Sequence, residues 1–228
     1  MRRSLTALSF IGLVASIAQA GPPTPLVLSV IDNTGNGLPG LAPFTDNEAV
    51  ATTLDGFIAS SVFAIDGGDL DALHRLPNGN WLVSSNFNGS FNGTAFLDGD
   101  IVEIDLGAGT VVQTVISESQ LAGSAADISA ISVLANGNLA VGFRGTTTLG
   151  GITFDDGDIA EFDPNSGAAS TLVAQADLFD DGDGEISGVH AFADGTFLLS
   201  FSSTTESISG TVFRDGDIIL YNPTDDSA

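Results

Sequence analysis

The sequence predicts an all-β protein built from repeated units of four antiparallel strands. Three observations lead to this prediction: a motif that returns at a fixed interval, Asn-Gly or Asp-Gly turns between short apolar runs, and no helical periodicity beyond the N-terminal segment. The turn glycines Gly79, Gly137 and Gly195 lie 58 residues apart in both intervals. Self-similarity of this length is typical of architectures in which each unit packs on the next one.

The first twenty residues have the three parts of a secretory signal peptide. Arg2 and Arg3 form a basic start, residues 5–17 are mostly apolar, and Ala18-Gln19-Ala20 matches a cleavage signal. The apolar run is too short to favour a membrane span, and no later run is longer. We therefore expect residues 1–20 to be a signal peptide and the protein to be secreted, with the periplasm as the alternative location.

Composition excludes several classes of function. The 228 residues include 29 acidic and five basic side chains, a net charge of −24, and the five basic residues are all arginine. Without lysine or cysteine, Schiff-base and thiol catalysis, disulfides and thiolate zinc sites are impossible. The strong negative charge repels phosphates and anionic lipids. We therefore expect no nucleic-acid partner and no membrane insertion.

Each complete unit is predicted to contain four strands. In the unit that begins at Asp69, strand one covers residues 72–76, and an Asn-Gly turn follows in which both central residues are expected to have positive φ. Strand two covers residues 81–85, a polar connection leads to strand three at 100–105, and strand four covers 110–116. The matching segments in later units are 139–143 and 197–201 for strand two and 169–174 for strand four.

Four-stranded antiparallel units with a long period are typical of propeller blades. The stretch Asp100-Ile-Val-Glu-Ile-Asp-Leu-Gly-Ala-Gly-Thr-Val-Val-Gln-Thr-Val resembles the outer hairpin of NHL- and YVTN-type β-propeller repeats of secreted bacterial proteins. The resemblance covers about residues 44–222 and implies a β-propeller fold without a particular activity. The period is longer than is usual in these repeats, and the excess lies between strands two and three.

The units of the propeller domain, residues 21–228, are predicted near 26–65, 69–118, 127–176 and 185–222. The first and last units supply three strands each, so we expect 14 strands in about four blades. The two ends do not complement each other into one shared blade. We therefore expect a partial propeller that is truncated at its C-terminus, or one that closes by self-association through open blade edges. The alternative is a compact ring of four blades, two of them short.

An Asp-Gly-Asp triplet recurs in the units and has two interpretations. Carboxylates two residues apart on a glycine turn can share a calcium ion. Alternatively, an aspartate bonds the backbone of its own turn while the glycine supplies the left-handed conformation. Repetition in unit after unit favours the architectural role. The triplets are Asp98-Gly99-Asp100, Asp156-Gly157-Asp158 and Asp215-Gly216-Asp217.

An acidic cluster at residues 177–185 occurs in one unit alone and is the best candidate for a metal site. The equivalent residues 119–127 contain a single acid, Asp127, so scaffold geometry does not explain the cluster. It resembles the start of a calcium loop but is no EF-hand, because Phe179 and His190 replace the acidic first and last ligands. The alternative is a solvated acidic linker. The predicted calcium ligands are Asp177, Asp180, Asp181, Asp183 and Glu185.

The two histidines, His74 and His190, occupy the same repeat position, with Ser132 as the middle equivalent. They are interpreted either as ligands or acid–base groups facing a central channel, or as half-buried strand residues without a chemical role. Two units of separation is expected to be too far for one metal ion. Phe87 and Phe91, in the first long connection, are the candidates for exposed aromatic side chains.

These observations predict a non-enzymatic extracellular β-propeller module that serves as a scaffold or binds a protein or glycan partner through its long connections, with calcium as the one candidate cofactor. No catalytic residue is assigned. The alternative is a propeller hydrolase or lyase that uses carboxylates and histidine at the mouth of the channel. An enzyme would need a histidine and acids converging in one pocket.

Overall fold

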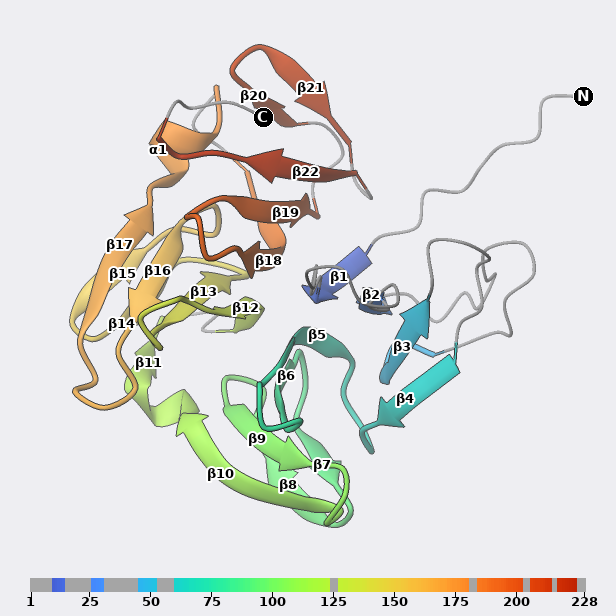
Figure 1. The fold of residues 1–228 in the computed structure, drawn as a ribbon. Coiled ribbons are helices and arrows are strands. Elements are labelled where there is room, and N and C mark those ends of the chain that lie inside the picture. Colours follow the sequence, from blue (N-terminus) through green and yellow to red (C-terminus); the bar gives the residue numbers. More distant parts are fainter. Residues whose placement is uncertain are drawn as a thin grey trace, which may run out of the picture.

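The computed structural model describes residues 10–14, 26–30, 45–52, 60–123, 127–180, 184–202, 206–214 and 217–224. Four antiparallel sheets stand around a common centre as the blades of a propeller (Figure 1). The innermost strands are β1, β5, β12 and β18, and β1 packs against both β5 and β18. The predicted all-β propeller with about four blades is therefore confirmed.

The strands of each blade follow one another in chain order from the centre outward. Blade one contains β1 (Phe10–Val14), β2 (Leu26–Val30), β3 (Glu48–Thr52) and β4 (Ser60–Ala64). Blade two contains β5 (Leu70–Arg75), β6 (Trp81–Ser85), β9 (Ile101–Asp105) and β10 (Thr110–Ile116). Blade three contains β12 (Ile128–Val133), β13 (Leu139–Phe143), β16 (Ile159–Phe162) and β17 (Ala169–Val173). The described strands of blade four are β18 (Ile186–Ala191), β19 (Phe197–Phe201) and β22 (Ile218–Tyr221).

Blade one has one more strand than expected. The segment Phe10–Val14, inside the predicted signal peptide, forms β1 and pairs with β2. A short apolar run cannot be assigned to a helix or a strand by periodicity alone. In the structure, residues 10–14 are extended and pair with β2 as a strand.

The long connections between the second and third strands of three blades fold into additional hairpins, where only polar connections were expected. Their tight turns place two consecutive residues at positive φ, the conformation of the type I′ turn that suits a two-residue hairpin. The turn residues are Asn92 and Gly93 (φ 48° and 82°), Gly150 and Gly151 (61° and 84°), and Ser209 and Gly210 (49° and 75°). The hairpins are β7 (Gly89–Phe91) with β8 (Thr94–Phe96), β14 (Thr147–Leu149) with β15 (Ile152–Phe154), and β20 (Glu206–Ile208) with β21 (Thr211–Phe213). In blade three, β11 (Leu121–Ala122) also pairs with β14.

The turn between β5 and β6 is not the expected one with two residues at positive φ. The Leu76 N–H donates to the Asn80 carbonyl, and the Gly79 N–H donates to the Leu76 carbonyl. Only Gly79 has positive φ, 93°, because a three-residue hairpin loop needs just one left-handed residue. The turns at Gly137 and Gly195 repeat this geometry.

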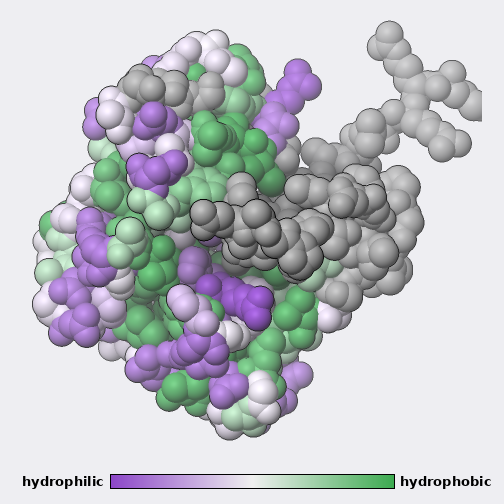
Figure 2. Space-filling model, viewed as in Figure 1, coloured by the Kyte–Doolittle hydropathy of each residue, from purple (hydrophilic) through white to green (hydrophobic). Residues whose placement is uncertain are grey.

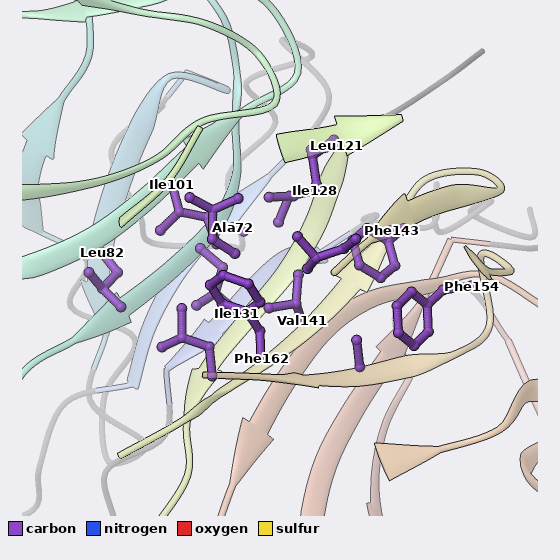
Figure 3. Close-up of a cluster of buried hydrophobic side chains, with 14 residues drawn as sticks. Ala72, Leu82, Ile101, Leu121, Ile128, Ile131, Val141, Phe143, Phe154 and Phe162 are labelled. Carbon is purple, nitrogen blue, oxygen red and sulfur yellow. The ribbon is translucent and has the colours of Figure 1, made fainter. Parts of the chain in front are cut away.

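The core consists of three apolar clusters, one at each interface between consecutive blades. Between blades two and three, Ala72 and Ile101 face Ile131 and Val141 (Figure 3). Among the described residues, the buried apolar faces of the sheets therefore pack against neighbouring sheets, as the repeat predicts.

Two short helical turns lie in the connections that lead to the next blade: the 3-10 turn η1 (Glu118–Gln120) and α1 (Gln175–Leu178). No helix in the described part of the chain is long and apolar enough to cross a membrane.

Candidate functional site at the centre of the propeller

Three of the four inner strands, β5, β12 and β18, share a β-bulge near their first residues. The pairing register shifts at Asp71, Ser129 and Ser187, which occupy the same repeat position. A bulge leaves one residue out of the ladder and redirects its side chain, and such positions are common beside functional sites. The repeat therefore places one redirected polar side chain near the start of the inner strand in each of blades two, three and four.

Asp71 differs from its two equivalents because no donor group of the described residues pairs with its carboxylate, and its side chain can share a hydrogen bond only with the carboxyl of Asp127 when one of the two is protonated. Ser129 Oγ donates to the Ile186 carbonyl at 2.7 Å, and Ser187 Oγ lies 3.2 Å from Ser200 Oγ. Asp71 is 1% exposed, and within the described ranges neither of its oxygens accepts a hydrogen bond from an N–H group or a hydroxyl. A buried carboxylate without a hydrogen bond is costly in its charged form.

Two charged side chains act on the carboxyl group of Asp71, those of Asp127 and Arg144. Burial, followed by the negative charge of Asp127, raises the pKa of Asp71 well above its usual value, whereas Arg144 lowers it. Burial raises the pKa of Asp127 to about 6, with Arg144 opposing. The Arg144 Nε lies 3.6 Å from Asp127 Oδ2. Both pKa values are thus raised above that of an ordinary aspartate, which is the direction that suits a general acid.

His74 and His190 lie close together in the structure. Their ring centroids are 6.1 Å apart and their planes differ by 19°. Both residues lie on innermost strands, which brings their rings closer together than two units of separation in the sequence suggested. Each is 8% exposed.

Both imidazoles are neutral at pH 7 and have a free ring nitrogen. Burial lowers the pKa of each histidine to about 4, and the nearby His190 adds to the effect on His74. Neither Nδ1 atom has a hydrogen-bond partner among the residues that the structure describes. The ring of His190 also meets Phe192 edge-on, with centroids 5.0 Å apart. Ser132, the equivalent residue of blade three, is satisfied because its Oγ accepts from the Ala191 N–H at 2.9 Å.

The structure does not assemble the described members of the predicted calcium cluster. Asp177 and Asp180 are exposed, and Glu185 is half-buried. Asp180 Oδ2 accepts from the Gly210 N–H at 2.8 Å, and this bond lowers the pKa of Asp180. Asp181 and Asp183 lie outside the described residues. Within those residues no three acidic, histidine or cysteine side chains are grouped to hold a metal ion, so calcium binding here stays a prediction.

The aspartates of the Asp-Gly-Asp triplets hold the backbone, as the architectural interpretation expects, but its second part was wrong: neither Gly99 nor Gly157 has positive φ. Asp100 Oδ2 accepts from the Leu97 N–H at 2.9 Å, and its Oδ1 accepts from the Glu118 N–H at 2.8 Å. Asp158 repeats both bonds, to the Asp155 and Gln175 N–H groups, and Asp217 accepts from the Arg214 N–H. In blades two and three these carboxylates connect the turn to the start of η1 or α1.

Comparison with known proteins gives similarity of structure alone. No protein-family model matches the sequence, and no curated protein matches it. A protein of unknown function from Bacteroides caccae is 15% identical, with a TM-score of 0.39, and 92% of this chain covers 60% of it. Virginiamycin B lyase from Staphylococcus aureus is 12% identical, with a TM-score of 0.42, over 95% of this chain and 58% of the lyase. A luciferin-regenerating enzyme is 12% identical, with a TM-score of 0.41, over 95% and 59%.

This chain thus spans about 60% of the length of these three proteins. At such identities and TM-scores, the similarity carries no information about the activity of this chain.

Proposed function

We propose that this protein is a non-enzymatic extracellular β-propeller module that binds a protein or glycan partner through its additional hairpins. The main supporting observation is that large apolar side chains are exposed on these hairpins and beside them. Phe87, just before β7, is 62% exposed, and Val212, on β21, is 60% exposed. Leu97, just after β8 of the first hairpin, and Ile152, on β15 of the second, are also exposed. Figure 2 shows apolar patches among hydrophilic residues on the face in view.

Phe87 has the properties of a preorganised anchor. Ser85 Oγ donates to the Phe87 carbonyl at 2.7 Å, and the preceding Asn86 bonds Asp69 through its side chain and its backbone. A Cβ atom on Gly68 would lie 2.7 Å from the Phe87 carbonyl oxygen, so the chain is tightly packed here. An exposed aromatic ring on a fixed backbone loses little entropy when a partner covers it. Phe91, the other candidate, is buried on β7.

The test compares Phe87→Ala with Val112→Ala in binding to glycan arrays and to immobilised candidate proteins. Val112 is a matched control, because it is an exposed apolar residue of the same blade on the outer strand β10. We expect Phe87→Ala to weaken binding about tenfold or more, which corresponds to about 1.4 kcal/mol, and Val112→Ala to leave it unchanged. Equal binding by both variants would contradict the role of Phe87. Absence of any bound glycan or protein would contradict the binding function.

A hydrolase or lyase is the second candidate function, and the pair Asp71 and Asp127 favours it. A carboxyl group whose pKa lies near neutrality can donate a proton to a leaving group. The test is turnover of glycan and ester substrates by the wild type, Asp71→Asn and Asp127→Asn. Turnover that falls at least a hundredfold in both variants supports an enzyme, and no turnover by the wild type excludes it for these substrates.

A further inference from the structure

We propose that the outer edge of β22 in blade four binds an extended segment of a partner protein, which adds to the sheet as a fourth antiparallel strand. The segment is expected to carry apolar side chains at alternate positions and no acidic residues. The proposal concerns the edge of a sheet and does not depend on binding through the additional hairpins, so either proposal can fail without the other.

The repeat shows what occupies this edge in other blades. In blades two and three the third strands, β9 and β16, pair on their outer side with the fourth strands β10 and β17. The equivalent strand of blade four, β22, pairs with β19 and with no other strand of the described residues. The row of N–H and C=O groups on its other side can therefore pair with an added strand.

Two apolar side chains of β22 are exposed at this edge. The recurring Asp-Gly-Asp-Ile motif aligns Ile218 with Ile101 and Ile159. Ile218 is 40% exposed, whereas its equivalents, each paired with a fourth strand and packed in an interface between blades, are 0% exposed. Leu220 is 56% exposed and lies two residues further on, so both side chains share one face of the sheet. An added strand would therefore cover apolar surface as well as pair backbone groups.

The residue at position 220 distinguishes this edge from those of blades two and three. The equivalent residues, Glu103 and Glu161, accept hydrogen bonds from asparagine side chains of the turn between the first two strands. The residues opposite them on the fourth strands are polar, Gln113 and Ser170. Leu220 accepts no such bond, so an apolar residue is expected opposite it in the added strand.

The edge of β22 also lacks a feature found at the outer edges of the other two blades. β10 and β17 form those edges, and each contains a bulge, seen as a shift in its pairing register. Bulges interrupt the row of edge groups and discourage pairing with another chain. The pairing of β22 with β19 is regular over Ile218–Tyr221. A regular, apolar edge of this kind suits strand addition.

Charge narrows the choice of partner. A chain with a net charge of −24 repels an acidic segment and also repels a second copy of itself. Asp217, directly before β22, is exposed and adds negative charge beside this edge. A neutral or basic segment of another protein is therefore favoured over a second copy.

The probe is a fluorescent synthetic peptide with blocked ends and the sequence of residues 167–174, which include β17, with the substitution Ser170→Leu. If the peptide pairs with β22 as β17 pairs with β16, this leucine lies opposite Leu220. We expect the peptide to bind the wild-type chain in a fluorescence anisotropy titration, and the unsubstituted peptide to bind more weakly. Leu220→Glu, which introduces the residue of blades two and three, should weaken binding about tenfold or more.

Val112→Glu is the matched control, because Val112 is an exposed apolar residue on the bulged edge strand β10, and it should leave binding unchanged. Peptide binding that survives Leu220→Glu, or no binding by the wild type, would overturn the proposal. Phe87→Ala should also leave peptide binding unchanged. A loss of binding in that variant would place the peptide at the hairpins instead and contradict the proposal.

Two measurements on the wild type do not depend on how the variants fold. Methylation of the backbone nitrogens of the peptide removes its donors and keeps its side chains, so it should abolish binding. Equal binding of the methylated peptide would contradict strand addition. Sedimentation of the chain alone tests the other occupant: we expect a monomer, and a dimer that Leu220→Glu dissociates would assign this edge to a second copy and overturn the proposal.

Discussion

The imidazole rings of His74 and His190 face each other at 6.1 Å although they belong to the second and fourth blades. The inner strands of a propeller converge on the centre, so residues at one repeat position can meet across it. Ser132 on the blade between them bonds the backbone of β18 instead. At this repeat position, the residue of blade three makes a hydrogen bond, whereas the residues of blades two and four form a pair of stacked imidazoles.

The histidine pair should make the protein less stable in mild acid. Unfolded histidine has a pKa near 6.5, and both folded values are about 4, so the unfolded chain binds protons first as the pH falls. The free energy of unfolding should therefore fall between about pH 6.5 and 4, by up to roughly 3 kcal/mol per histidine.

Urea unfolding at pH 7, 5.5 and 4.5 measures this effect. The matched control is the double variant His74→Ser/His190→Ser, in which the decrease over this interval should be much smaller. The same decrease in both proteins would show that the imidazoles are not its source.

Replacement of Asp71 by serine should stabilise the protein at neutral pH. The pKa of Asp71 is raised in the folded state, so its contribution to stability is present below the unfolded value and is lost as the pH rises through the folded value. Asp71→Ser introduces the residue found at Ser129 and Ser187, and it should add about 1–3 kcal/mol at pH 7.5 and much less at pH 4.

Chemical denaturation at these two pH values distinguishes this effect from a simple loss of packing. Ser129→Ala is the control, because it removes the bond to the Ile186 carbonyl and should destabilise the protein equally at both pH values. An Asp71→Ser variant that is less stable than the wild type at pH 7.5 would contradict the prediction.

Loss of the Asp100 carboxylate should weaken the junction between blade two and η1. Asp100→Ala removes the acceptor of two backbone N–H groups, from Leu97 and Glu118, and should cost about 2–4 kcal/mol. Asp98→Ala, in the same triplet, should cost less than half as much, because it leaves both bonds in place. Thermal or urea unfolding measures both changes, and equal losses would disprove the capping role.

Calcium binding at the acidic cluster remains a prediction with a direct test. Asp181→Ala and Asp183→Ala should abolish the heat of calcium binding in a calorimetric titration, if these carboxylates are ligands. Asp180→Ala should instead weaken the attachment of the β20–β21 hairpin, since Asp180 already accepts from the Gly210 N–H. Calcium binding that survives all three substitutions would place any site elsewhere.

Local sequence was sufficient for most of the strands. The segments predicted at 81–85, 139–143 and 197–201 coincide with β6, β13 and β19, because turn residues and apolar runs are local signals. The hairpins in the long connections were missed even though Asn92-Gly93 and Gly150-Gly151 are strong signals of two-residue turns. The strands of these hairpins are short and contain polar residues, a composition that predicts a loop.

The sequence by itself determined that the chain forms repeated antiparallel sheets, and that His74, Ser132 and His190 are equivalent. The strands follow from local patterns within one unit, and the equivalence follows from aligning the units with one another. Only the tertiary structure decided that His74 meets His190 and that Asp71 lies beside Asp127. These contacts join strands far apart in the chain. They depend on how many blades surround the centre and on where each bulge directs its side chain, which no local pattern specifies.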